Sequence, residues 1–73
     1  LEAVYFPEDR QLAIYSATSE PLRVTAPGLT PQDLKPGYWL GQLGAPAREL
    51  NLEVSVGPRR FHWLLRLDSP EPG

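Results

Sequence analysis

The 73-residue sequence lacks cysteine altogether and has a single histidine, His62. Without cysteine there is no disulfide framework and no thiolate metal site, and one histidine is too few for the usual zinc-ligand sets. The nine aspartates and glutamates are dispersed along the chain rather than clustered as in a calcium loop. We therefore expect neither a metal nor another cofactor, and the cysteine count leaves the cellular compartment unknown.

Long apolar runs and a strong positive charge are missing as well. The apolar runs are only a few residues long, whereas a helix that crosses a bilayer needs about 20 apolar residues. The formal net charge of -2 argues against tight, sequence-independent binding to a polyanion. These absences favour a soluble module without a membrane partner.

The length of the chain allows one small domain. A domain of this size buries only about 60% of the surface of its unfolded chain, so its core must be efficient. We predict a single β domain over residues 1–68, followed by a proline-rich tail or linker at residues 69–73. Because the chain starts at Leu1 rather than at methionine, we expect a processed product or a domain of a longer protein.

The nine prolines and six glycines separate short apolar segments instead of forming a run. This placement favours ordered turns over a disordered linker. The segments between the turns are rich in residue types that are common in strands. The predicted strands are residues 3–6, 11–15, 21–25, 38–43, 49–56 and 60–67.

The clearest strand pattern lies near the C-terminus. Leucine and valine alternate strictly with polar residues up to Val56, and apolar residues then occupy every odd position from Phe61 to Leu67. A four-residue turn at 57–60 would pair Val56 with Phe61 and Val54 with Trp63. All eight apolar side chains would then share one buried face, whereas a register shift of one residue would divide them.

A second hairpin is predicted at the N-terminus, around a turn at residues 7–11. The predicted register places Val4 opposite Ile14. In this register Val4 and Phe6 share the face of Ile14, and Tyr5 points to the other side.

Residues 30–35 carry the signals of a helix start: a threonine N-cap, a proline at the first helical position and an acid three residues after the cap. Lys-Pro-Gly at 35–37 ends such a helix within about one turn. A short turn that leads into a strand resembles the entry to small barrels of the OB or SH3-like kind. We predict an all-β fold, a small antiparallel barrel or sandwich of that size, with five or six short strands and one helical turn near residues 31–35.

His62 is the natural candidate for acid-base catalysis, because histidine alone titrates near neutral pH without perturbation. Side-chain parity places it beside Ser55 on the exposed face of the last hairpin. A nucleophile and its base need a third group that orients the base, and the spacing supplies neither that acid nor a nucleophile elbow. We interpret the pair as a solvated cross-strand contact and predict no enzymatic activity.

Apolar residues on an otherwise polar face point to contact with another protein. Leu64 interrupts that face of the last hairpin, and Trp39 lies in a segment that is apolar on both faces. Tryptophan and arginine are also enriched in binding hot spots. The predicted partner-binding residues are Trp39, Arg59, Arg60, His62, Leu64 and Arg66. In the competing interpretation, Trp39 and Leu64 complete a second small core under the loop at 27–37.

The primary functional hypothesis is a non-catalytic protein–protein interaction or assembly module, as an accessory subunit or as one domain of a longer chain. An exposed edge strand at residues 22–24 is a second way to hold a protein partner. The alternative is a small barrel that binds single-stranded nucleic acid, because Arg59 and Arg60 adjoin Phe61 and Trp63. The negative net charge disfavours that alternative, and the sequence identifies neither the partner nor the oligomeric state.

Overall fold

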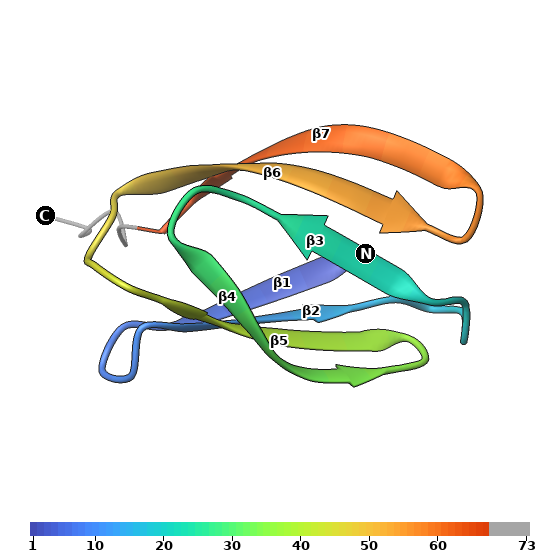
Figure 1. The fold of residues 1–73 in the computed structure, drawn as a ribbon, viewed down its shortest axis with the longest axis horizontal. Coiled ribbons are helices and arrows are strands. Elements are labelled where there is room, and N and C mark those ends of the chain that lie inside the picture. The colour runs from blue at the N-terminus through green and yellow to red at the C-terminus, as the bar shows by residue number, and fades with distance from the viewer. Residues whose placement is uncertain (68–73) are drawn as a thin grey trace, which may run out of the picture.

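Residues 1–67 are described by a computed structural model, in which seven antiparallel strands form two sheets (Figure 1). The strands are β1 (Glu2–Phe6), β2 (Gln11–Tyr15), β3 (Leu22–Thr25), β4 (Leu29–Lys35), β5 (Tyr38–Leu43), β6 (Glu49–Val56) and β7 (Arg59–Arg66). One sheet has the strand order β1-β2-β5-β4 and the other has the order β3-β6-β7. The tail predicted at 69–73 lies outside the described residues.

The core lies between the two sheets and is built from alternating residues. Along β6 the even-numbered residues are buried and the odd-numbered ones face outward, because successive side chains of a strand point to opposite faces. The odd-numbered residues of β5 are buried in the same way. The core residues are Leu12, Ile14, Leu22, Val24, Trp39, Leu43, Leu50, Leu52, Val54, Val56 and Leu67.

This arrangement confirms the prediction of a small all-β fold and selects the sandwich. The two sheets remain separate, so the barrel form of the prediction is wrong, and residues 1–67 contain seven strands rather than five or six. No helix is present in residues 1–67, and hence none that could span a membrane.

The predicted helical turn at 31–35 is wrong, because this segment belongs to β4. A single helical turn gains little packing, whereas the extended chain pairs with β5 along its length. Pro31 is tolerated because β4 is an edge strand whose register shifts between Pro31 and Asp33. Pro36 and Gly37 form the hairpin turn, and the positive φ of Gly37 (76°) suits the second central position of a type II turn.

The C-terminal hairpin forms with the predicted side-chain parity but in another register. Val56 pairs with Arg59, and Val54 pairs with Phe61, around a two-residue loop. Gly57 opens this loop with a φ of 57°, as the first position of a type II′ turn requires. The register differs from the predicted one by two residues, so every side chain keeps its predicted face.

The N-terminal hairpin forms in a register that reverses the prediction. Ala3 lies opposite Ile14, and Tyr5 lies opposite Leu12, around a four-residue loop. Tyr5 therefore packs against the core, while Val4 is exposed on the outer face. The predicted register was wrong by one residue, which exchanges the two faces of a strand.

Candidate binding site

The predicted partner-binding residues fall into three different environments. Arg60, His62, Leu64 and Arg66 point from β7 to the outer face of the three-stranded sheet, because they alternate with residues directed at the core. Arg59 has the opposite parity and lines a hollow on the inner side of β7.

Trp39 does not belong to this surface. Its side chain is 1% exposed and lies in the core between the sheets. Leu64, by contrast, is 54% exposed. The two residues that looked equivalent in the sequence thus have opposite roles in the structure, and only Leu64 is available to a partner.

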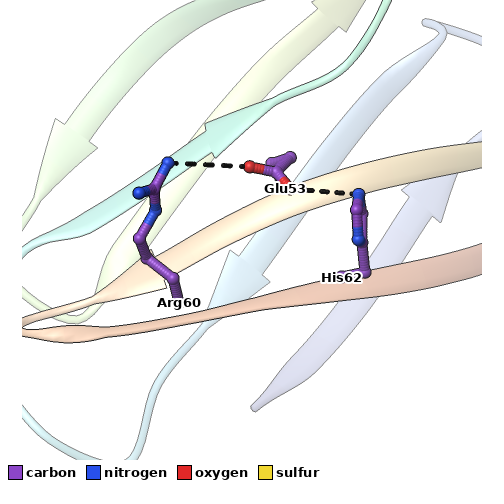
Figure 2. Close-up of polar contacts among 3 residues, drawn as sticks. All are labelled: Glu53, Arg60 and His62. Atoms are coloured by element: carbon purple, nitrogen blue, oxygen red, sulfur yellow. Dashed lines mark ion pairs between the residues drawn. The ribbon is translucent and has the colours of Figure 1, made fainter.

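Glu53 joins two of the outward residues of β7 (Figure 2). It lies opposite His62, and its Oε2 is 3.0 Å from Nε2 of the imidazole. Its other oxygen, Oε1, is 3.8 Å from the Arg60 guanidinium. This contact corrects the predicted pairing, because Ser55 faces Arg60 rather than His62. The carboxylate therefore holds both basic side chains on the same exposed face.

The chemistry of this cluster is that of a charged surface. A carboxylate beside an imidazole could orient a catalytic base, but Ser55 and His62 share no hydrogen bond within residues 1–67. In the same residues no group of three or more potential metal ligands comes together. The arrangement offers cationic and hydrogen-bonding groups to a partner.

The backbone of β7 is free along one edge. Leu67 N donates to Arg48 O at 2.7 Å, so the odd-numbered residues of β7 direct their backbone groups towards β6. In an antiparallel ladder, the intervening residues direct their N–H and C=O groups the other way. No other strand of residues 1–67 has Cα atoms within 8 Å of β7. His62 and Leu64 therefore present unpaired backbone groups at this edge.

The inner side of β7 near the turn is incompletely covered. A hollow of about 540 Å³ separates it from the N-terminus and from the loop at 16–20. Phe61 and Trp63 line this hollow together with Leu1, and Phe61 is 40% exposed. Phe61 therefore points to the inner side of the sheet, as predicted, but the prediction that it is buried was wrong.

A second hollow, of about 600 Å³, lies on the outer face of the three-stranded sheet. Arg23 and Arg60 line it from the strands on either side of β6, and both lie opposite Ser55. On this face Arg23, Arg60 and Arg66 are offset in part by Glu49 and Glu53, which leaves a small excess of positive charge.

The four-stranded sheet has an exposed apolar face that the sequence analysis missed. Val4, Phe6 and Tyr15 are exposed there, beside the partly buried Tyr38 and Leu40. The signal was present as apolar residues of both parities in 2–6 and 11–15. The incorrect N-terminal register hid it, because it directed Val4 and Phe6 inward.

Comparisons with protein-family models, with curated proteins and with solved structures find no match to this chain. The function of the chain is therefore inferred from its own residues and their geometry.

Proposed function

We propose that this protein is a non-catalytic interaction module that binds a protein partner by adding a strand to the free edge of β7. The observation that carries the proposal is the eight-residue length of β7, which is paired on one side only. An extended segment laid along this edge would satisfy the outward backbone groups of Arg60, His62, Leu64 and Arg66.

Side chains on both faces of β7 add to this backbone edge. Leu64 offers apolar area on the outer face, and Phe61 and Trp63 offer it on the inner face. Full burial of such a side chain contributes roughly 1.5 to 3 kcal/mol before the costs of association. The charged residues of β7 also protect the edge against indiscriminate pairing, which native edge strands require. These groups therefore favour a selective contact over aggregation.

β7 suits this role better than β3, the other edge of the same sheet. β3 has only four residues and lies beside β4 and β5 of the other sheet. A partner strand that paired with β3 at residues 22–24 would therefore form fewer backbone hydrogen bonds, and the other sheet would restrict its approach.

The proposal is tested by selecting binders and mapping where they bind. A library of short random peptides is selected against the immobilised protein, and hydrogen exchange of the backbone amides is then measured with and without each selected peptide. We expect slower exchange at His62 and Leu64. Selected peptides that slow exchange around Val4 and Tyr15 instead, or a selection that yields no binder, would contradict the proposal.

A pair of variants at one position separates the backbone from the side chain. Leu64→Pro and Leu64→Ala both remove the leucine side chain, but only proline removes the outward N–H. We expect the proline variant to bind the selected peptides at least about tenfold more weakly than the alanine variant, which corresponds to about 1.4 kcal/mol. If proline disturbs folding, N-methyl-leucine at position 64 of a synthetic chain removes the same N–H group.

Binding of single-stranded nucleic acid is a second candidate, supported by Arg59 beside the exposed Phe61 at one hollow. The remaining cations of β7 lie on the opposite face from Phe61 and Trp63, which separates phosphate pairing from base stacking. A labelled single strand titrated at low and high salt distinguishes the two candidates. Affinity that falls steeply with salt would favour nucleic acid.

A further inference from the structure

The charge of β7 indicates which strand its free edge accepts. We infer that the partner is an extended segment in which acidic and apolar residues alternate, an inference that rests on the function proposed above. β7 contains three of the seven lysines and arginines of the chain, together with its only histidine, and none of its nine acids. The alternation of side chains along β7 indicates which residue types the added strand would have on each face.

Residues of an added strand would lie next to β7 residues of the same face. On the outer face they would adjoin Arg60, His62, Leu64 and Arg66, where acidic side chains gain from three basic neighbours. On the inner face they would adjoin Phe61, Trp63 and Leu65, where apolar side chains would cover the exposed Phe61. A segment with one acidic and one apolar face meets both requirements.

β6 already shows this pattern on the paired edge of β7. Its outward residues include Glu49 opposite Arg66 and Glu53 opposite His62, and its inward residues are all leucine or valine. Figure 2 shows the Glu53 carboxylate between Arg60 and His62. Its oxygens lie 3.8 Å from the guanidinium and 3.0 Å from the imidazole. The same side chains of β7 are accessible from its free edge. A strand with acidic residues outward and apolar residues inward would therefore suit that edge as well.

A second copy of this chain is a poorer complement than a separate acidic segment. Two β7 strands paired antiparallel about Trp63 would set Arg60 opposite Arg66 of the other copy, and like charges in opposite positions are destabilising. The other free edge at this side of the sandwich is β1, whose single acid is Glu2. Neither strand alternates acids with apolar residues.

The inference is tested with three synthetic peptides of equal length. Valine alternates with glutamate in the first, with threonine in the second and with lysine in the third, and hydrogen exchange at His62 and Leu64 reports pairing with β7. We expect the glutamate peptide to bind at least about tenfold more tightly than the threonine peptide at low salt. Salt should reduce this preference, because the charges on the outer face are exposed.

Two variants locate the source of the preference. The double variant Arg60→Gln and Arg66→Gln should bind the glutamate and threonine peptides equally, whereas Lys35→Gln, on the other sheet, should keep the preference. Thermal unfolding of each variant verifies that the sandwich is intact.

The results with the three peptides distinguish failure of the acidic preference from failure of the proposed strand addition. If the threonine peptide protects β7 as well as the glutamate peptide does, the acidic preference is wrong and the strand-addition function stands. If none of the peptides protects β7, both fail. A dimer that forms through β7 at the concentrations used, seen by sedimentation and by protection of His62 without peptide, would also overturn the inference.

Discussion

The indole ring of Trp39 lies across the backbone of Gly41, two residues further along β5. A Cβ atom added to Gly41 would come within 2.6 Å of Cζ3 of the ring and within 3.1 Å of the Thr30 carbonyl oxygen. Both positions lie on the buried face of β5, and Gly41 pairs with Leu12 and Pro31 of the neighbouring strands. The largest buried side chain of the protein thus fits only because its neighbour on the same face has no side chain.

Gly41→Ala should therefore destabilise the fold by about 1 to 3 kcal/mol, because overpacking forces the indole from its position. Urea unfolding followed by tryptophan fluorescence measures this change. Gly44→Ala is the matched control, since its added Cβ would meet nothing closer than 3.8 Å. Equal stability of the two variants would show that the ring can move away at no cost.

Trp39→Ala should cost about 3 to 5 kcal/mol, because it removes the largest buried side chain of the core. Small domains have only about 5 to 15 kcal/mol of stability in total, so this variant should be partly or wholly unfolded at room temperature. Leu64→Ser should change stability by less than about 0.5 kcal/mol, since Leu64 is exposed. Circular dichroism during thermal unfolding compares the stability of the two variants. A Trp39→Ala variant that stays fully folded would contradict the placement of Trp39 in the core.

Gln42→Ala should loosen the loop between β1 and β2. The Gln42 side-chain amide donates to Asp9 O at 2.7 Å, and its carbonyl oxygen accepts from Gln32 at 3.3 Å. We expect a loss of about 1 kcal/mol and faster hydrogen exchange at residues 8–10. Gln32→Ala is the control, because within residues 1–67 the Gln32 side chain bonds only to other glutamine side chains. Unchanged exchange in the Gln42 variant would mean that the backbone alone holds this loop.

Glu53→Gln should strengthen binding of the acidic peptide, because it removes the carboxylate that now engages Arg60 and His62. Exposed ion pairs contribute little to folding, so the stability of the variant should change by less than about 1 kcal/mol. Isothermal titration with the glutamate peptide measures the affinity. Glu2→Gln, on the other sheet, makes the same change of net charge and should leave the affinity unaltered. Weaker binding by the Glu53 variant would imply that this carboxylate positions Arg60 for the partner.

The fold class and the faces of the last two strands could be predicted from the residues alone. Strict alternation from Leu50 to Val56 places side chains on opposite sides of any strand, whatever that strand packs against. For this reason the two-residue error in the register of the C-terminal hairpin left each side chain on its predicted face.

Features that depend on partners elsewhere in the chain could not be predicted in this way, because they are set by how the strands assemble. The face on which Tyr5 lies depends on whether the loop between β1 and β2 has an even or an odd number of residues. β4 is a strand because its backbone pairs with β5. Trp39 is buried and Leu64 exposed because burial depends on what lies across each strand. The free edge of β7 follows from sheet order, because local sequence sets how a strand alternates but not which strands become its neighbours.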